Sequence, residues 1–267
     1  MKKVAVILLT WGRPNNFKKT LEMLDAQEYK NFTLYVSSGN TKIHNFCKST
    51  AEEFKASLEI KFYDDGNDYM CFRRFFLAKE LAKSGVDIVI NIDDDIVLGP
   101  NFVGDSVAQF EPETIKAVSA IHLHNGESYF GTRTLITPEL EGLLEADFAV
   151  GQCTMFDARF FLAESELYKI PSGYYECDDL WASYIARVYL NWEIKPLYVE
   201  IKDIGGDAAA LYSKSNKKQE LLQKLRGGWI DGRPVFEEKL AQLGISMTAK
   251  QKRQRNFLPT DFNKNPK

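Results

Sequence analysis

Short apolar runs alternate with amphipathic stretches through the first half of the chain. The expected strands lie at residues 4–9, 32–36, 58–63 and 87–92, and the first of these is a continuous apolar run. Continuous runs of this length are typical of strands that are buried on both faces of a sheet. One amphipathic stretch begins at Arg13, and two more occupy residues 41–54 and 72–83. The repeated strand–helix pattern predicts an α/β fold with a mainly parallel, twisted sheet flanked by helices.

The second half of the chain is less regular. The expected strands or extended segments occupy residues 117–122, 129–136, 149–156 and 192–201. The expected helices occupy residues 157–164, 179–190 and 216–225. The pattern contains no internal repeat and no low-complexity linker, so we expect one domain.

Composition and charge narrow the class of protein. The chain has 267 residues, of which 45% are hydrophobic and 27% charged, as in ordinary soluble globular proteins. A net charge of −3 argues against a generally basic nucleic-acid binder. Residues 248–267 hold six basic residues and one acid, a net +5, which leaves −8 for the rest of the chain. This basic tail could be solvated, or it could contact an anionic lipid surface or nucleic acid.

Cysteine spacing and hydropathy indicate the compartment. The four cysteines are scattered and form no CxxC pair, so neither a zinc site nor a disulfide framework is expected. Reduced thiols in a cytoplasmic protein are the simplest interpretation. The apolar run at residues 4–9 is short for a signal peptide, and no run approaches the ~18 residues that a membrane-spanning helix needs.

Three consecutive aspartates end the fourth expected strand. Asp93, Asp94 and Asp95 follow the apolar run directly, and in open parallel sheets ligands bind at the carboxyl ends of strands. Mg²⁺ is typically held by one or two carboxylates together with substrate phosphates. The aspartates therefore indicate a site for a divalent cation and a nucleotide diphosphate, although they could simply form a turn.

A second pair of acids begins an expected helix. Asp178 and Asp179 precede Leu180 and Trp181, and a helix N-terminus stabilises an ionised carboxylate. The pair could cap the helix. It could also supply the general base that takes a proton from an acceptor hydroxyl.

Four stretches, taken in order, resemble one family. The run at residues 6–14, VILLTWGRP, is similar to a first strand and nucleotide-binding loop usually written V-I-I-P-T-Y-N-R. The run at 20–29, TLEMLDAQEY, is similar to T-L-x-S-L-x-x-Q-x-Y. The triplet at 93–95 fits a DxD motif, and DDLW at 178–181 fits an ED-like motif. Together these motifs resemble the GT-A glycosyltransferases, in particular the family 2-like inverting enzymes, over roughly residues 3–229.

The resemblance implies a Rossmann-like GT-A catalytic domain at residues 1–230. Its nucleotide-sugar-binding half would cover about 1–110 and its acceptor-side half about 111–230, followed by a C-terminal helix and basic tail at 231–267. The implied nucleotide-binding residues are Thr10, Trp11, Arg13, Asp65, Arg73, Arg74, Asp93, Asp94 and Lys217. Either Arg73 or Arg74 could approach the nucleotide, or both could belong to a solvated helix face. Lys217 belongs to residues 212–218, which could be a mobile lid or an exposed basic turn.

The resemblance also implies the metal ligands and the base. Asp95 would be the principal ligand of Mn²⁺ or Mg²⁺, with Asp93 near the metal or the ribose. Asp179 would be the catalytic base, with Asp178 as the alternative.

The chain departs from the family pattern in three places. Residues 36–40, VSSGN, lack the aspartate that reads uracil in many members, and Asp64 or Asp65 could replace it. No histidine follows residue 124, so Asp203 or Asp207 would have to complete the metal site, unless the metal binds only with the nucleotide. His122 and His124 are expected to pack or hydrogen-bond within a strand. The base motif reads Asp-Asp where Glu-Asp is usual.

The expected function is that of a metal-dependent glycosyltransferase. It would move a sugar from a nucleotide-diphosphate sugar, UDP-sugar being the first expectation, to an acceptor hydroxyl with inversion. The acceptor could be a surface glycan, a glycolipid or a hydroxylated DNA base. The expected location is the cytoplasm, with contact to the inner membrane face or to DNA through the basic tail. Two alternatives are a nucleotidyltransferase and a non-catalytic sugar-nucleotide-binding protein.

Overall fold

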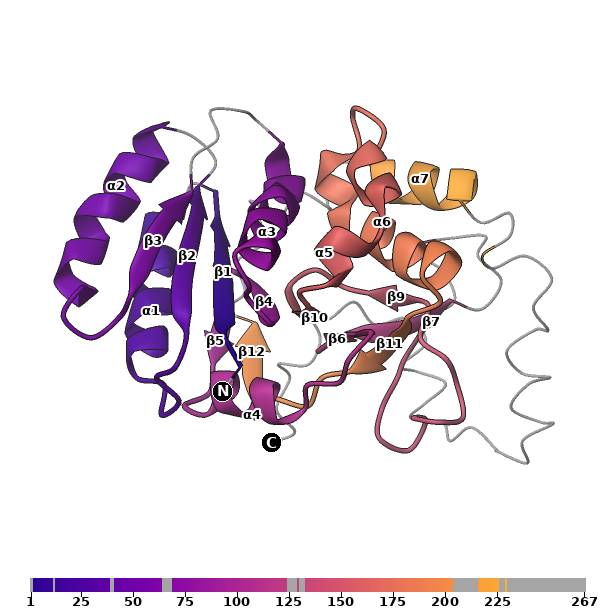
Figure 1. The fold of residues 1–267 in the computed structure, drawn as a ribbon, viewed down its shortest axis with the longest axis horizontal. Helices are drawn as coiled ribbons and strands as arrows, with labels where there is room; N and C mark the ends of the chain where they lie inside the picture. The colour runs from indigo at the N-terminus through magenta and orange to yellow at the C-terminus, as the bar shows by residue number, and fades with distance from the viewer. Residues whose placement is uncertain are drawn as a thin grey trace, which may run out of the picture.

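A computed structural model gives the fold. It describes residues 2–11, 13–38, 41–63, 69–123, 129, 133–203, 216–225 and 229. A seven-stranded sheet forms the centre, with the strand order β11-β6-β10-β4-β1-β2-β3. Only β10 is antiparallel to its neighbours in this sheet. The prediction of a mainly parallel α/β sheet flanked by helices is confirmed (Figure 1).

The first half of the chain follows the predicted strand–helix alternation closely. Its strands are β1 (Val4–Thr10), β2 (Thr33–Ser38), β3 (Ile60–Tyr63) and β4 (Ile88–Asp93). Its helices are α1 (Pro14–Asp25), α2 (Thr41–Ala51) and α3 (Arg73–Lys83), with single 3₁₀ turns at Glu52–Phe54 and Met70–Phe72. A proline in the first turn begins α1, because its fixed φ suits that position. Two short elements that the pattern does not predict follow, β5 (Ile96–Leu98) and α4 (Phe102–Ala108).

Two expected strands of the second half are each divided in two. The run at 117–122 becomes β6 (Thr114–Ala117) and β7 (Ala120–Leu123), because the chain leaves the large sheet and enters a three-stranded one. The run at 149–156 becomes β9 (Phe148–Ala149) and β10 (Cys153–Asp157), with a turn at Gly151. Within the expected strand at 129–136, the structure shows β8 (Arg133–Leu135), which pairs with β7.

The remaining elements are shorter than their apolar patterns suggest. The expected helix at 157–164 is limited to α5 (Phe160–Ala163), because Asp157 still belongs to β10. The expected helix at 179–190 is α6 (Asp178–Tyr184) followed by a π-helical turn at Ile185–Tyr189. The extended run at 192–201 divides into β11 (Glu193–Pro196) and β12 (Ile201–Asp203), and α7 spans Lys217–Leu225. Further 3₁₀ turns lie at Ser165–Lys169 and Tyr175–Cys177.

Alternating side chains of the central strands fill two apolar layers. Val6 and Leu8 of β1 pack on the side of α1 and α2. Ala5 and Ile7 pack on the opposite side, with α3, α5 and α6. Figure 1 shows α3 beside β1 and β4, close to the second half of the chain. Strands buried on both faces explain the continuous apolar runs in the sequence.

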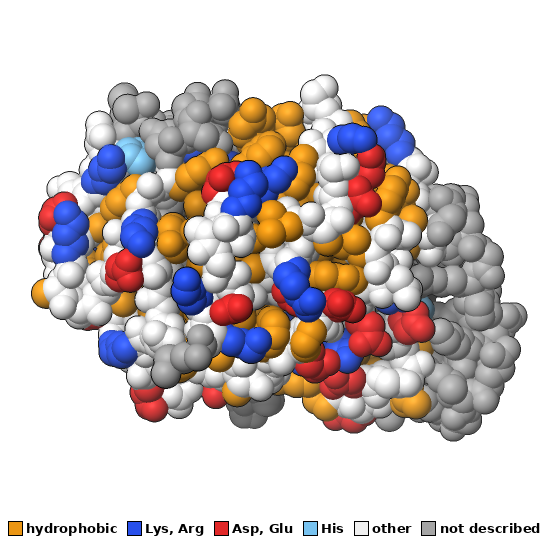
Figure 2. All heavy atoms as spheres, viewed as in Figure 1, with side chains coloured by type: hydrophobic (Ala, Val, Ile, Leu, Met, Phe, Trp, Pro, Cys, Tyr) orange, Lys and Arg blue, Asp and Glu red, His pale blue; other side chains and the backbone are white. Residues whose placement is uncertain are grey.

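The surface carries mixed charge. Figure 2 shows lysine, arginine and acidic side chains interspersed over one face, so the described residues give this face no continuous basic field. At the β6–β11 end of the sheet, Lys116 and Lys195 both pair with Glu111. Among the described residues, no helix is long and apolar enough to cross a membrane. The four cysteines, all in the described part, are free, as the scattered spacing predicts.

Candidate active site

Polar side chains gather where β1, β2 and β4 end. Thr10 pairs in register with Ser38 of β2, and Leu9 pairs with Asp93 of β4. Parallel strands bring these carboxyl ends to one edge of the sheet, which is where open α/β sheets bind ligands. The aspartate triplet therefore lies beside the end of the first strand, as predicted.

Each aspartate of the triplet has a different partner. Asp93 Oδ1 accepts a hydrogen bond from Arg74 Nη1 at 2.9 Å. Asp94 Oδ2 accepts one from Thr10 Oγ1 at 2.6 Å, so Asp94 anchors the end of β1. Asp95 Oδ2 lies 2.7 Å from Arg13 Nη1, which also lies 3.3 Å from Asp94 Oδ1. The three adjacent carboxylates thus serve three distinct contacts.

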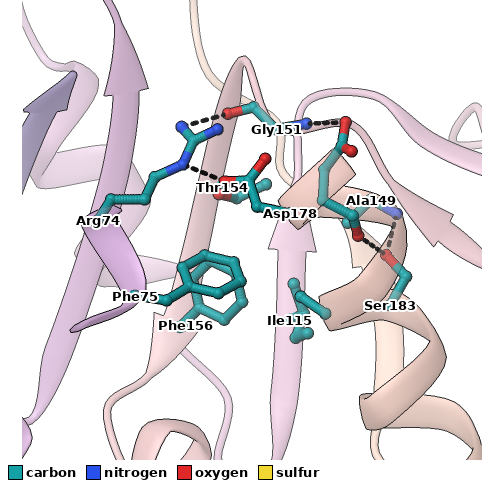
Figure 3. A pocket seen from close by; sticks show the side chains of 11 residues that line it. Arg74, Phe75, Ile115, Ala149, Gly151, Thr154, Phe156, Asp178 and Ser183 are labelled. Atoms are coloured by element: carbon teal, nitrogen blue, oxygen red, sulfur yellow. Dashed lines mark hydrogen bonds and ion pairs between the residues drawn. The ribbon is translucent and has the colours of Figure 1, made fainter. Parts of the chain in front are cut away.

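Arg74 joins the two acidic motifs. Its Nε donates to Asp178 Oδ2 at 2.6 Å, while its Nη1 donates to Asp93 and, at 3.2 Å, to the Gly151 carbonyl. Figure 3 shows the guanidinium of Arg74 between the Gly151 turn and Asp178. Two charged motifs that are far apart in the sequence therefore share one buried cation.

Asp178 and Asp179 begin α6 and are both buried. Asp179 Oδ1 accepts from the backbone N–H of Leu180 at 2.8 Å, and its Oδ2 accepts from the N–H of Gly151 at 3.3 Å. Asp178 is held by Arg74, and its side chain is 2% exposed, compared with 4% for Asp179. Of the two carboxylates, Asp179 is the one bound mainly by backbone groups and by a lysine.

That lysine is Lys218 of α7, the last residue of the basic segment 212–218 that was considered as a lid. Its Nζ lies 2.5 Å from Asp179 Oδ2 and 3.4 Å from the hydroxyl of Tyr129. The neighbouring Lys217, which was expected to bind the nucleotide, pairs with Glu176 at 3.0 Å. Only the helical spacing of residues 216–225 was available in the sequence, and it does not show which lysine points inward.

Gly151 is a site residue that the sequence pattern does not indicate. A Cβ atom at this position would lie 3.0 Å from Arg74 Nη2 and 3.1 Å from Asp179 Cβ. Both contacts are tight, so a side chain would push the two charged residues apart. The N–H and C=O of Gly151 thus connect Arg74 to Asp179 through one peptide segment.

A small, partly open pocket is lined by several of these groups. It has room for about one water molecule. Phe75, Ile115 and Phe156 provide its apolar walls, and Thr154 and Ser183 are among its polar residues (Figure 3). Apolar walls beside the buried ion pairs lower the local dielectric, which strengthens these pairs.

Burial and charge shift several pKa values here. Burial raises the pKa of Asp93 to about 7. The charge of Arg74 opposes this rise, and the charge of Asp95 adds to it. Burial also raises the pKa of Asp94, against the hydrogen bond from Thr10. Burial lowers the pKa of Arg74, but Asp178 and Asp93 raise it well above its ordinary value, so the guanidinium stays charged. Burial lowers the pKa of Lys218 as well, but Asp179 raises it, which keeps the amine cationic.

The donor atoms at the triplet fit a hard cation in part. Asp95 Oδ1 is buried and has no hydrogen-bond partner, and its Oδ2 is held by Arg13. Within the described part of the chain, no three Asp, Glu, His or Cys side chains converge in an arrangement that could hold a metal. The protein could therefore offer Asp95, with Asp93 nearby, and phosphate oxygens would complete the coordination of Mg²⁺.

The other expected site residues lie as follows. Thr10 and both arginines of α3 are buried, and 37% of Trp11 is exposed. His122 Nδ1 bonds the Glu145 carbonyl at 2.8 Å, as expected for a histidine that packs within a strand. Asp64, Asp65, His124, Asp207, residues 204–215 and the tail at 231–267 lie outside the described residues, and the side chain of Asp203 is also outside them.

No known family model matches the chain, and no curated protein matches it. Many solved structures are similar in fold, including the following three. S. aureus TarS 1-349 is 15% identical with a TM-score of 0.52, over 73% of this chain and 58% of that one. The mannosyltransferase PcManGT of Pyrobaculum calidifontis, in complex with GDP-Man and Mn²⁺, is 13% identical with a TM-score of 0.56. The similarity covers 90% of this chain and 67% of that one. GalNAc-T7, with UDP, GalNAc and Mn²⁺, is 9% identical with a TM-score of 0.56, over 73% and 42%.

These similarities define the fold class. The chain has the GT-A fold, and the sequence-based expectation of this fold is confirmed. The chain spans 58% of the TarS structure.

Proposed function

We propose that the protein is a metal-dependent glycosyltransferase that uses a nucleotide-diphosphate sugar and an acceptor hydroxyl. One observation carries the proposal: Arg74 bonds Asp93 at the sheet edge and Asp178 at the start of α6. A donor-binding motif and a candidate base thereby share one network. Proteins of the same fold were solved with UDP-GlcNAc and with GDP-Man and Mn²⁺, which supports this class of donor.

The sheet edge would bind the donor. Thr10, Trp11 and Arg13 lie at the end of β1, where a nucleotide and its diphosphate would approach. Asp95, with Asp93, would hold Mn²⁺ or Mg²⁺. The ion, when bound, neutralises negative charge that develops on a diphosphate leaving group. A UDP-sugar is the first expectation for the donor.

Asp179 would take the proton from the acceptor. The acceptor oxygen forms a bond to the anomeric carbon, the bond from that carbon to the diphosphate oxygen breaks, and the hydroxyl proton passes to Asp179. In-line attack inverts the anomeric configuration. Asp178 would instead orient Arg74, because its Oδ2 already accepts the 2.6 Å bond from that guanidinium.

The acceptor classes are a surface glycan, a glycolipid or a hydroxylated DNA base. The described residues give the face in Figure 2 mixed charge, so phosphate contacts there would be few. We propose a glycan or glycolipid hydroxyl as the first acceptor class to screen, and we propose that the protein acts in the cytoplasm.

Thermal unfolding with nucleotides tests the donor site. UDP, GDP, CDP, dTDP and their sugars would be compared with and without Mn²⁺ or Mg²⁺. A ligand at ~100 times its dissociation constant should raise the free energy of unfolding by about 2.7 kcal/mol. The shift should require the metal and disappear in Asp95→Ala. A folded protein that responds to no nucleotide would contradict the proposed function.

Turnover then separates the two acidic residues. Asp179→Asn should keep the thermal shift with donor and lose about 10²–10⁴ in kcat, because the proton acceptor is removed. The stability of this variant without donor should also fall, because Lys218 loses its buried partner. Asp178→Asn should disturb Arg74 and weaken donor binding as well. Lys18→Gln, which removes an exposed charge that pairs with Glu53, is the matched control. Equal donor binding and equal turnover in both asparagine variants would exclude this assignment.

A further inference from the structure

Arg13 is bound to the carboxylate that the metal would need. Its Nη1 lies 2.7 Å from Asp95 Oδ2 and 3.3 Å from Asp94 Oδ1. The pair is only partly exposed, with 27% of the Arg13 side chain and 19% of the Asp95 side chain reached by solvent. Burial lowers the pKa of Arg13, but its hydrogen bond with Asp95 and the charge of Asp94 raise it, so Arg13 stays cationic.

The two acids that Arg13 contacts are not equivalent. Asp94 also accepts the 2.6 Å bond from Thr10, so it has a second protein partner. Asp95 has Arg13 on Oδ2 and no hydrogen-bond partner on its buried Oδ1. A buried carboxylate oxygen without a donor is costly unless another group binds it. Asp95 is therefore the carboxylate of the triplet most suited to exchange one cation for another.

Arg13 itself has donor capacity to spare. Its Nε is buried and has no hydrogen-bond partner. A guanidinium presents five donors in a planar fork, and this fork matches the oxygens of a phosphate. Arg13 lies just beyond β1, at the edge of the sheet where the diphosphate would bind. The present contacts thus use part of a group that fits an oxyanion.

A metal ion and Arg13 cannot share Asp95 Oδ2 freely. Mg²⁺ lies about 2.1 Å from its oxygen ligands, and Arg13 Nη1 already lies 2.7 Å from this oxygen. Two cations at such short range repel each other. Arg13 would therefore withdraw from Asp95 if the ion coordinates Oδ2, alone or together with the free Oδ1.

We propose that Arg13 is a resident counter-ion that occupies Asp95 in the metal-free protein and turns to the donor diphosphate when a divalent cation takes its place. The inference rests on the proposed function, because it deepens the description of the same donor site. Arg13 makes metal alone bind weakly and makes metal and nucleotide bind cooperatively. By linkage, the nucleotide raises the metal affinity by the same factor as the metal raises the nucleotide affinity.

The test is a titration with Mn²⁺ in which the electron paramagnetic resonance signal reports the concentration of the free ion. The proteins titrated are the wild type, Arg13→Gln, Arg13→Lys and Lys18→Gln. Each protein is titrated alone, with UDP and with GDP. Arg13→Gln should bind Mn²⁺ alone about tenfold more tightly than the wild type and lose most of the nucleotide-dependent gain, within the 5–150-fold range of ordinary couplings. Arg13→Lys should keep part of the gain, and Lys18→Gln should match the wild type. Thermal unfolding without ligand confirms that each variant is folded.

The possible results distinguish a failure of the inference about Arg13 from a failure of the proposed function. Mn²⁺ affinity that is unchanged or weaker in folded Arg13→Gln would overturn the inference, even if nucleotides bind normally. A nucleotide-dependent gain that Arg13→Gln retains in full would overturn it as well. If neither nucleotide changes Mn²⁺ binding in the wild type, the donor site as proposed fails, and the comparison with Mn²⁺ alone still decides whether Arg13 competes for Asp95. No binding of Mn²⁺ by any variant would overturn both.

Discussion

Lys218 Nζ and Asp179 Oδ2 lie 2.5 Å apart, so an ion pair joins helix α7 to the first turn of helix α6. The pair is largely buried, with 13% of the Lys218 side chain and 4% of the Asp179 side chain exposed. Leu221 and Leu222 of α7 are buried in the same core as Leu180. The contact therefore covers the proposed base and fixes α7 against the site.

Breaking this pair should destabilise the protein strongly. Lys218→Met leaves the Asp179 charge buried without its cation, which typically costs about 3–5 kcal/mol. Asp179→Asn should cost less in the Lys218→Met background than in the wild type, because the shared interaction is already lost. Urea unfolding of the wild type, both single variants and the double variant gives the coupling free energy. Additive effects would show that the two groups do not interact in solution.

Sequence patterns are sufficient where local periodicity decides the structure. The apolar runs at 4–9 and 87–92 predict central strands correctly, because strands buried on both faces need continuous apolar residues. The aspartate triplet is also predictable, because it directly follows such a run. These features depend on neighbours in the sequence.

The rest of the site depends on contacts between distant residues. Arg74 and Asp178 are separated by 104 positions, and Lys218 and Asp179 by 39. Gly151 looks like an ordinary strand residue until the fold brings Arg74 and Asp179 to both sides of it. With one sequence, periodicity indicates that a helix covers residues 216–225, but it does not show which lysine reaches the carboxylate. The division of the run at 149–156 into two strands also depends on contacts between distant residues, so the local pattern does not predict it.

Gly151→Ala should disturb the site through steric contact. The new Cβ would lie 3.0 Å from Arg74 Nη2 and 3.1 Å from Asp179 Cβ, so both residues must move. Overpacking of this kind costs about 1–3 kcal/mol, and a shift of about 1 Å in a catalytic group can cost 10²-fold in rate. Thermal unfolding and the rate of sugar transfer would be measured together.

Gly104→Ala is the matched control for that substitution. Gly104 lies within α4, and a Cβ there meets only Tyr29 Cβ at 3.4 Å, an ordinary contact. Alanine favours the helix over glycine by about 1 kcal/mol, so this variant should be at least as stable as the wild type and equally active. If Gly151→Ala behaved in the same way, the Gly151 turn could not be holding Arg74 and Asp179 in place.

Arg74→Lys should separate charge from geometry. A lysine keeps the positive charge but presents a single ammonium, which cannot reproduce the bonds from Nε to Asp178 and from Nη1 to Asp93. We expect the transfer rate to fall about 100-fold through misplacement of the two motifs. Arg187→Lys, at a pair whose Glu145 side chain is 73% exposed, should leave the rate unchanged. Wild-type kinetics in Arg74→Lys would show that charge alone is enough.

Asp157 should make the free energy of unfolding depend on pH in the acidic range. This buried carboxylate ends β10 and accepts hydrogen bonds from the N–H of Glu113 at 3.2 Å and the N–H of Arg159 at 3.0 Å. Burial raises its pKa, but the bonds from Arg159 and Glu113 outweigh burial and lower the pKa below its ordinary value. The folded protein therefore binds the proton less readily than the unfolded chain. Asp157 thus contributes stability above an unfolded pKa of about 3.9, and this contribution is lost as the pH falls through the lower folded pKa.

Urea unfolding of the wild type and Asp157→Asn between about pH 7 and pH 2 tests this linkage around the ordinary carboxyl pKa. At pH 7 the variant should be less stable by about 1.5 kcal/mol, because hydrogen bonds to a charged group are replaced by weaker neutral ones. The difference should shrink below about pH 4, where Asp157 of the unfolded wild type begins to bind a proton, until the folded carboxylate is protonated at lower pH. Glu53→Gln removes an exposed carboxylate of a surface pair and should change the stability little at any pH. A difference between wild type and Asp157→Asn that stayed constant down to the lowest pH would mean that the charge of Asp157 does not stabilise the end of β10.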